Sequence, residues 1–405
     1  MVSARSGHYV KQPTGYKAFI PAALPPKPPI RLDETGVSAL SSADLAVGRL
    51  DGVAQTLPNP DLFVAMYVRR EAVLSSQIEG TQSTLEDVLA FELDPKTRDV
   101  PKDVEEIVNY VKAMNYGIDR LAQLPLSLRL IREIHAELMQ GVRGQHKTPG
   151  EFRRSQNWLG PSPTTPIERA TFVPPPVHEM NVALDDFEKF LHAEQSMPVL
   201  LHCGTAHAQF ETIHPFLDGN GRVGRLLISF LLVHRGVMHR PLLYLSHYLK
   251  ANHLEYYARL MAVREDGDWE GWLTFFLHGV AETAADATTT AKRILAMRDD
   301  HRARIQEAMS PNGLRLLDLL FRRPLVNVGL IEERLKLAFV TAAKLLDGLV
   351  ELGVVEEITG GRRNRVYRYS PYLALFADPA PRPVAPDPQD AEGDGGAGQQ
   401  RLPIE

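Results

Sequence analysis

The chain has 405 residues, of which 44% are hydrophobic and 23% charged, and its formal net charge is −5 at pH 7. This length exceeds one ordinary domain and supplies enough apolar residues for a sizeable core, so we expect two or three domains. Because the chain is slightly acidic, it has no overall excess of basic residues through which it could bind nucleic acid. A single cysteine, Cys203, excludes an internal disulfide and a cysteine-based metal cluster.

Neither a membrane span nor a signal peptide is expected. The longest largely apolar run, Leu226–Val233, is much shorter than the ~20 residues that a membrane helix requires. The N-terminus has no apolar signal core, and one cysteine is typical of a reducing compartment. We therefore expect a cytoplasmic protein with no membrane contact.

The first 32 residues are predicted to form an extended arm, because residues 19–29 contain too many prolines for a helix. From residue 33 to 308, apolar residues recur at three- and four-residue spacing, which predicts a bundle of α-helices. Helices are predicted at 42–56, 60–77, 84–91, 101–121, 126–139, 177–195 and 199–210, and a long one at 272–309.

Residues 157–176 interrupt the helical pattern with Gly160 and six prolines. Ala170–Val173 fits a short strand. Long loops inside compact domains are usually functional, although a surface excursion is the simpler alternative.

The stretch 214–225 reads His-Pro-Phe-Leu-Asp-Gly-Asn-Gly-Arg-Val-Gly-Arg and combines the groups that phosphate chemistry requires. His214 can accept a proton near neutral pH, and the Asp218 carboxylate is a hard oxygen ligand for Mg²⁺. Gly219 and Gly221 allow main-chain N–H groups to approach an anion closely. A polar loop between two helices is the structural alternative.

Two arginines stand three residues apart in this stretch. If a helix begins near Gly221, Arg222 and Arg225 lie on one face beside a positive helix N-terminus that favours a phosphate. The same residues satisfy the G-x-G-x-x-G dinucleotide fingerprint. That fingerprint requires a preceding strand and an acidic residue about twenty positions later, whereas no Asp or Glu occurs between Asp218 and Glu255. We therefore set a dinucleotide-binding fold aside.

The twelve residues resemble the signature of the Fic family, His-x-Phe-x-Asp/Glu-Gly-Asn-Gly-Arg-x-x-Arg, at every fixed position. Residues 130–135, 150–153 and 267–272 are also similar to the family, so the resemblance covers roughly residues 15–370. It implies a Fic helical bundle that transfers AMP from the cosubstrate ATP, with Mg²⁺, to a Tyr, Ser or Thr hydroxyl. The acceptor would be a protein target, including the protein itself.

The resemblance also assigns roles within the stretch. His214 would be the general base and Asp218 the Mg²⁺ ligand. Residues 157–176 would be a β-hairpin flap that aligns the target by β-augmentation, with Phe172 facing the target. The nucleotide would be bound by Asp218, Gly219, Asn220, Gly221, Arg222, Val223, Gly224 and Arg225.

An upstream segment, Ser75-Ser-Gln-Ile-Glu79-Gly80, matches the inhibitory-helix pattern of the family. A Glu before a helix-ending Gly is common, so this pattern alone favours a solvated carboxylate. Together with the signature, it implies an inhibitory helix near residues 66–80. Because a guanidinium binds a carboxylate or a phosphate equally well, Glu79 would compete with the γ-phosphate for Arg225.

The choice of cosubstrate rests on weaker signals. Gly221 agrees with AMP transfer, because relatives that transfer phosphate resemble this motif with a lysine at that position. Tyr256 and Tyr257 match a tyrosine pair that flanks adenosine in the family, although an aromatic pair on a helix is more often core. For His135, His202 and His207 we expect local hydrogen bonds rather than a zinc site.

Residues 309–376 are predicted to form an α+β winged helix, with helices at 314–321, 328–335 and 339–352 and strands at 354–358 and 365–369. Its wing carries Arg362, Arg363, Arg365 and Arg368, as a DNA phosphate contact requires, but the third helix is not basic. Residues 377–405 are predicted to be disordered. Two hypotheses remain: an autoinhibited nucleotidyltransferase, and a nucleotide-sensing winged-helix regulator that binds DNA.

Overall fold

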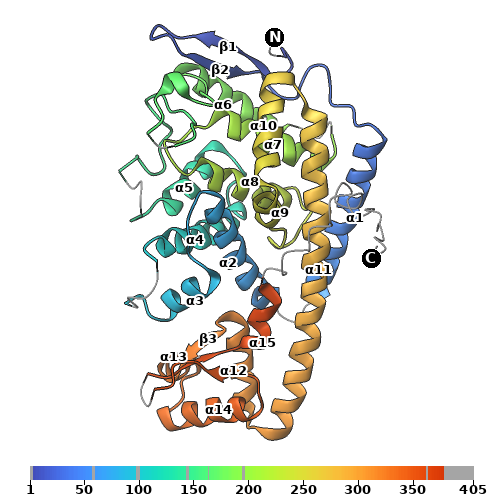
Figure 1. The fold of residues 1–405 in the computed structure, drawn as a ribbon. Coiled ribbons are helices and arrows are strands. Elements are labelled where there is room, and N and C mark those ends of the chain that lie inside the picture. Colours follow the sequence, from blue (N-terminus) through green and yellow to red (C-terminus); the bar gives the residue numbers. More distant parts are fainter. Residues whose placement is uncertain are drawn as a thin grey trace, which may run out of the picture.

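The structure, a computed structural model, describes residues 3–56, 60–96, 101–142, 146–162, 164–193, 197–361 and 364–377. It is mainly helical, with small antiparallel sheets, as predicted. The helical body occupies the upper part of Figure 1 and a smaller C-terminal unit the lower part. The long helix α11 (Trp269–Ala308) runs along both.

The helices predicted between residues 42 and 210 are all present. The first one begins at Glu34, because the Asp33 side chain accepts a hydrogen bond from the Gly36 N–H at 2.8 Å and so caps the helix. Besides α11, the body contains α1 (Glu34–Thr56), α2 (Pro60–Ile78), α3 (Leu85–Leu93), α4 (Val104–Leu121), α5 (Leu128–Leu138), α6 (Val177–His192), α7 (Val199–Ile213), α8 (Asn220–His234), α9 (Ser246–Ala251) and α10 (His253–Asp266).

The Gly-Asp-Trp-Glu-Gly-Trp segment at 267–272 forms the junction between α10 and α11. Gly267 ends α10 with a left-handed φ of 70°, and the Asp268 side chain caps the start of α11. Trp272 is fully buried, and its indole N–H donates to the carbonyl of Gly204 in α7 at 2.9 Å. The segment therefore holds both helices against α7.

The N-terminal arm contains a β-hairpin that the proline content did not predict. Strands β1 (Gly7–Lys11) and β2 (Lys17–Pro21) pair antiparallel. The N–H of Phe19 also donates to the carbonyl of Val173 at 2.9 Å. The hairpin therefore supports the end of the predicted flap.

The flap segment, residues 157–176, forms a minimal hairpin. Leu159 and Phe172 form an isolated antiparallel bridge, and a short 3-10 turn, η1 (Ile167–Arg169), lies between them. The strand predicted over Ala170–Val173 is reduced to this bridge. The prolines that begin at Pro174 carry no N–H and cannot extend a ladder.

Phe172 does not face outward, so its prediction as a target-facing residue is wrong. Its side chain is 2% exposed. The ring lies between the ring of Phe19, at a centroid distance of 6.0 Å, and the guanidinium of Arg264, at 3.9 Å. Apolar burial and a cation–π contact therefore hold this side chain inside.

The C-terminal unit follows the order of elements expected for the predicted winged helix, with one strand, β3, that the sequence analysis missed. The three strands form a sheet in the order β3-β5-β4. Two of the predicted wing arginines, Arg362 and Arg363, and the predicted tail from residue 378 onward lie outside the described residues. The unit contains α12 (Pro311–Arg322), β3 (Leu325–Asn327), α13 (Val328–Leu335), α14 (Phe339–Glu351), β4 (Glu356–Glu357), β5 (Val366–Arg368), α15 (Ser370–Leu373) and a short 3-10 turn, η2 (Ala374–Phe376).

The C-terminal unit packs against α2 and α3 of the body. Tyr67 of α2 contacts the ring of Phe376 edge-on at 5.3 Å. The Arg69 guanidinium of α2 binds Glu92 of α3, and the carbonyl of Glu92 accepts a hydrogen bond from Arg323 at 3.2 Å. The helix that leads to Glu79 is therefore held by both parts of the molecule.

Candidate active site

The residues of the 214–225 stretch form the loop between α7 and α8 and the first turns of α8. His214 ends α7 in a left-handed conformation, with φ 48° and ψ 60°. The residue before a proline avoids helical torsions, and Pro215 follows directly. Gly219, with φ 78°, then starts α8, and no side chain caps that N-terminus. The predicted helix start near Gly221 is confirmed.

Side-chain amides hold this loop closed. Asn220 accepts from the Phe216 N–H and donates to the Phe216 carbonyl, both at 2.8 Å. Asn157, at the start of the flap, donates to the carbonyls of His214 and Phe216 at 3.2 and 2.8 Å. Asn220 was expected to cradle a phosphate, but its side chain braces the loop.

His135 of α5 supports the same loop, which sequence reasoning missed. Its Nδ1 accepts from the Gly150 N–H at 2.9 Å, so Nε2 carries the proton and donates to the Asp218 carbonyl at 3.0 Å. Its ring stacks on Phe216 at 3.7 Å. Burial lowers the pKa of His135 to about 4, which keeps this tautomer neutral.

The surroundings of His214 disfavour its charged form. Burial, followed by the positive charges of Arg264 and Arg153, lowers the pKa of His214 to about 3. Arg153 is fully buried, and its Nε donates to the His214 carbonyl at 3.0 Å. His214 is therefore neutral at physiological pH, which is the form that can accept a proton.

The Asp218 carboxylate lies at the partly exposed edge of the site. One oxygen accepts from the Gly219 N–H at 2.7 Å, and the other lies 3.3 Å from Lys147 Nζ. The side chain is 28% exposed. Among the described residues, no group of three or more His, Cys, Asp or Glu side chains is placed to hold a metal ion.

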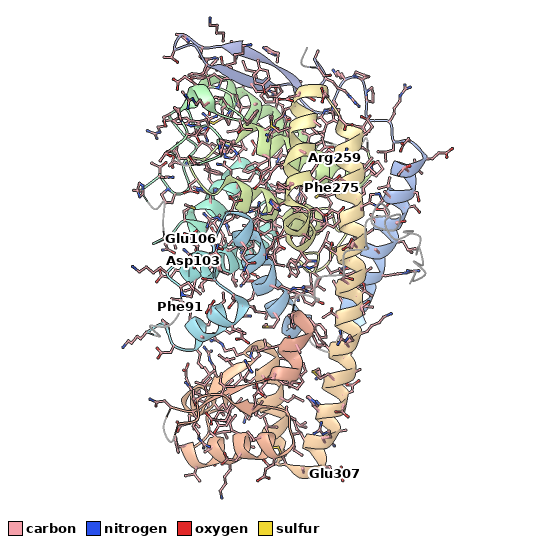
Figure 2. The ribbon with its side chains drawn as sticks, viewed as in Figure 1. Phe91, Asp103, Glu106, Arg259, Phe275 and Glu307 are labelled. Atoms are coloured by element: carbon pink, nitrogen blue, oxygen red, sulfur yellow. The ribbon has the colours of Figure 1, made fainter. Side chains whose placement is uncertain are left out.

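The two arginines of the motif contact different helices, although they were predicted to share one face. Arg222 pairs with the buried carboxylate of Glu106 on α4 at 3.0 Å; Glu106 is labelled in Figure 2. Arg225 turns toward α2, where its Nε donates to Ser75 Oγ at 2.7 Å and its Nη2 to the Ser75 carbonyl at 3.0 Å. A substrate phosphate would have to compete with these partners.

Glu79 lies in the turn after α2 and contacts Arg225 directly. Arg225 Nη2 donates to Glu79 Oε1 at 2.7 Å. Gly80 follows with φ 94°, which allows the chain to turn away. The carboxylate lies over Gly221, so a Cβ at position 221 would collide with it. The structure thus brings together Ser75, Glu79 and Arg225, which are far apart in the sequence.

Gly224 is covered by a second carboxyl group, that of Glu211 on α7. A Cβ at position 224 would collide with Glu211 Oε1, and this oxygen is buried without a hydrogen-bond partner among the described residues. Burial raises the pKa of Glu211 to about 7. Val223, between the arginines, is fully buried in the core, so its predicted nucleotide contact cannot come from its side chain.

The two tyrosines of the predicted adenine pocket differ in exposure. Tyr256 is buried, and its hydroxyl donates to Nε2 of His207, whose Nδ1–H donates to the Gly224 carbonyl. It therefore packs in the core. Tyr257 is 46% exposed. Its ring lies 5.0 Å from the ring of Tyr256, measured between ring centroids.

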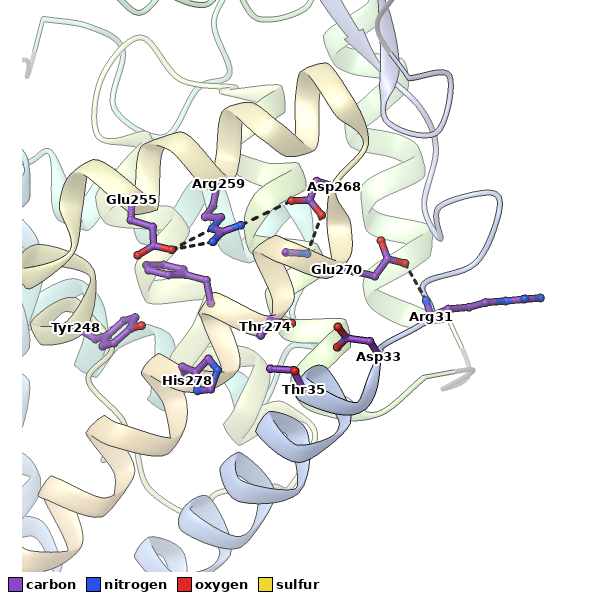
Figure 3. Close-up of a pocket in the computed structure, with 12 residues that line it drawn as sticks. Arg31, Asp33, Thr35, Tyr248, Glu255, Arg259, Asp268, Glu270, Thr274 and His278 are labelled. Atoms are coloured by element: carbon purple, nitrogen blue, oxygen red, sulfur yellow. Dashed lines mark hydrogen bonds and ion pairs between the residues drawn. The ribbon is translucent and has the colours of Figure 1, made fainter.

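A cavity of about 660 Å³ lies outside the motif, between α1, α9, α10 and α11 (Figure 3). Several of its charged side chains pair with one another. Arg259 lies between Glu255 and Asp268, at 3.0 and 3.8 Å, and Glu270 binds Arg5 at 2.6 Å. We assign this cavity no functional role.

Comparisons with known proteins agree with the motif. Residues 37–119 match a family model described as "Fic/DOC family N-terminal", and residues 125–232 match one described as "Fic/DOC family". The chain is a member of the Fic/DOC family. The family suggested by the signature is thus confirmed.

Curated relatives are named protein adenylyltransferase Fic. The protein of Drosophila grimshawi is 34% identical over 162 residues, which cover 38% of this chain and 29% of that protein. The protein of Culex quinquefasciatus is 30% identical over 199 residues, which cover 48% of this chain and 35% of that protein. This Fic chain therefore spans about a third of the length of these relatives.

Solved structures show the same fold. A Fic family protein from Desulfovibrio desulfuricans G20 has a TM-score of 0.55 at 20% identity, covering 84% of this chain and 97% of that chain. A Fic domain containing signaling protein from Bacteroides thetaiotaomicron VPI-5482 has a TM-score of 0.50 at 18% identity, covering 62% and 95%. Among the helices that the structure describes, none has the length and apolar character to cross a bilayer.

Proposed function

We propose that this Fic protein is a protein adenylyltransferase, which transfers AMP from MgATP to a Tyr, Ser or Thr hydroxyl of a protein. The observation that carries the proposal is the α7–α8 loop. This loop brings together a neutral His214, the Asp218 carboxylate and the N-terminus of α8, which no side chain caps. Arg225 follows within α8. The names of the curated relatives support the same activity.

In the proposed reaction the target hydroxyl attacks the α-phosphorus of ATP. A new P–O bond forms while the bond to the pyrophosphate oxygen breaks, and His214 accepts the hydroxyl proton. The free N–H groups at the start of α8 favour an anion there. Arg225 would neutralise the leaving pyrophosphate once its guanidinium is released from Glu79.

Asp218 fits a role as the Mg²⁺ ligand, because its carboxylate is partly exposed and one oxygen is bound only by Lys147 at 3.3 Å among the described residues. Mg²⁺ usually takes one or two carboxylates and completes its shell with phosphate oxygens and water. Such an ion would offset the charge of the phosphates. A single aspartate is therefore sufficient.

We further propose that Glu79 represses the enzyme. Its carboxylate bonds to Arg225 and lies over Gly221, beside the N-terminus of α8 that would receive phosphates. A γ-phosphate and this carboxylate would compete for the same guanidinium. Removal of Glu79 should therefore allow productive binding of ATP, and the released enzyme should then transfer AMP to its own hydroxyl groups.

The test is the intact mass of three proteins after incubation with MgATP: the wild type, Glu79→Gly, and Glu79→Gly combined with His214→Ala. We expect the mass of one AMP per modified site in Glu79→Gly, much less in the wild type and none without His214. Loss of a general base typically lowers the rate ~10²–10⁴-fold. A folded Glu79→Gly protein that gains no AMP, or a His214→Ala protein that still gains it, would contradict the proposal.

The alternative of a DNA-binding regulator has less support. Of the wing arginines that the structure describes, Arg365 lies 3.5 Å from Asp347, and Arg368 pairs with Glu356 and also with Glu86 of the body. Exposed residues at the start of α14 include the apolar Phe339 and Val340. We therefore favour the enzyme.

A further inference from the structure

Arg264, a buried residue near the end of α10, lies outside the signature but contacts two parts of the site. Its Nη2 donates to the Glu211 carbonyl at 3.1 Å and its Nε to Thr212 Oγ1 at 3.2 Å, both in the last turn of α7. On its other side, the guanidinium lies 3.9 Å from the centre of the Phe172 ring in the flap. The side chain is 4% exposed.

We propose that Arg264 is a positioning residue, which fixes the end of α7 that carries His214 and anchors the flap to it through Phe172. The inference rests on the proposed transferase function and deepens it. It assigns a role to a residue that the twelve-residue signature does not include.

The contact with α7 acts on His214 through the backbone. The last carbonyls of a helix lack partners within that helix and carry partial negative charge, so a cation is favoured there. Arg264 binds the Glu211 carbonyl in this turn, and His214 follows three residues later in a left-handed conformation. Arg153 donates to the carbonyl of His214 itself. The histidine ring is thus attached to a backbone fixed on both sides.

The contact with Phe172 sets the position of the flap. Phe172 forms the bridge with Leu159 that makes this segment a hairpin, and its ring is enclosed between Arg264 and Phe19. Because one guanidinium touches both α7 and Phe172, the distance between the flap and His214 depends on this side chain. A target segment aligned on the flap would be aligned on the general base as well.

Charge provides a second effect of the same residue. The groups that face His214 are Arg264 of α10, Arg153 from the loop after α5, and the Glu211 carbonyl and Asp218 from its own connection. After burial, Arg264 makes the largest contribution to the low pKa of His214, and Arg153 acts in the same direction, while the Glu211 carbonyl and Asp218 oppose them. Arg264 therefore adds to the effect of burial in favouring the neutral imidazole of His214.

Three variants separate these effects. Arg264→Met removes the charge and keeps the bulk, Arg264→Lys keeps the charge but cannot stack a planar group on the ring, and Phe172→Leu removes the ring and leaves Arg264. The His214 imidazole is titrated by NMR and assigned as the resonance missing from His214→Ala. Hydrogen exchange is measured at the amides of Leu159, Thr171 and Phe172, which form the bridge.

We expect Arg264→Met to raise the pKa of His214 and Arg264→Lys to leave it near the wild-type value. All three variants should speed hydrogen exchange at the bridge amides at least tenfold. A folded Arg264→Met protein that keeps the wild-type pKa of His214, or the wild-type rate of hydrogen exchange at the bridge amides, would overturn the proposal. If that variant does not fold, wild-type bridge exchange in Arg264→Lys would overturn it.

Neither readout requires catalysis, so the two proposals can fail separately. In the Glu79→Gly background, Arg264→Met should also move the acidic limb of the pH profile of AMP transfer toward higher pH. If Glu79→Gly itself transfers no AMP, the proposed function fails, and the titration and the exchange rates still decide the role of Arg264.

Discussion

The bond between Glu79 and Arg225 permits a graded test of repression, because charge and hydrogen bonding can be removed separately. Glu79→Gln keeps an acceptor at the same place and removes the charge, whereas Glu79→Gly removes both. Ser75 should still hold Arg225 in either variant, since Arg225 donates to Ser75 at 2.7 and 3.0 Å. The arginine therefore stays in place, and only its competitor changes.

The expected magnitude follows from the exposure of the pair. A hydrogen bond to a charged group contributes about 1.5–3 kcal/mol, and a neutral one about 0.5–1.5 kcal/mol. Arg225 is 2% exposed but Glu79 is 36% exposed, so water screens the carboxylate and the lower figure applies. Since 1.36 kcal/mol corresponds to tenfold in rate, Glu79→Gly should raise AMP transfer at least about tenfold, and Glu79→Gln only a few-fold.

The assay is the initial rate of AMP incorporation at MgATP well below saturation, which reports kcat/KM for ATP, with Glu34→Gln as a matched control. Glu34 is an exposed glutamate in the first turn of α1, and its replacement should leave the rate unchanged. Equal rates for the wild type, Glu79→Gln and Glu79→Gly, in proteins that still bind ATP, would refute the competition for Arg225. A rise in Glu34→Gln as large as that in Glu79→Gly would refute its specificity.

Two more predictions concern Gly221 of α8 and Glu211, the residue whose carboxyl group covers Gly224. Gly221→Ala places a methyl group where the Glu79 carboxylate lies and 3.0 Å from Arg225 Nη1. In a double-mutant cycle, replacing Glu79 by Gly should therefore raise transfer less in Gly221→Ala than in the wild type; additive effects would contradict it. Glu211 has a folded pKa of about 7, above its ordinary value of 4.5. The folded state therefore binds its proton more tightly, and this stabilisation is lost as pH rises from 4.5 to 7. The free energy of unfolding, measured with denaturant, should fall by about 3 kcal/mol more in the wild type than in Glu211→Gln over that pH range. If the free energies of the two proteins change with pH in parallel, this prediction is wrong.

The helical body was predictable because its helices carry regular apolar spacing. The helix at 199–210 and the long helix α11 were predicted from that spacing alone, and their ends moved by a few residues. The N-terminal hairpin was missed because its strands are five residues long and one ends at Pro21, within the proline-rich stretch. β3 has only three residues, and its pairing with β5 depends on tertiary structure.

The site was predictable where one short motif carries the chemistry. His214, Asp218 and Arg225 could be selected from the signature, and Glu79 from its pattern. The residues that hold these side chains in place could not be selected from the sequence, because their contacts join distant segments. These contacts are His135 to Asp218, Asn157 to Phe216, and Arg264 to both α7 and the flap. The only sequence signal for them was similarity near 130–135 and 150–153, which does not specify partners.

Phe172 shows why residue type misled the prediction. An aromatic residue in a proline-rich loop is a reasonable target contact, but an aromatic ring also gains most from burial. Here the ring is buried in contact with Phe19 and Arg264. A target would therefore meet the flap through its backbone rather than through this ring, in keeping with recognition by main-chain hydrogen bonds.

Two carboxyl groups beside α8, those of Glu79 and Glu211, bear on the proposed repression. A helix N-terminus favours an anion, and at rest Glu79 supplies one directly to Arg225. Glu211 lies as close to Gly224 but is fully buried, and burial raises its pKa to about 7, so a large share of it is neutral at physiological pH. Glu79 is the carboxylate proposed to compete with ATP for Arg225, and it lies in the turn that follows α2. The C-terminal unit contacts α2 at Tyr67, through Phe376, and contacts α3 at Glu92, through Arg323. It would therefore restrain a displacement of α2 that carried Glu79 away from Arg225.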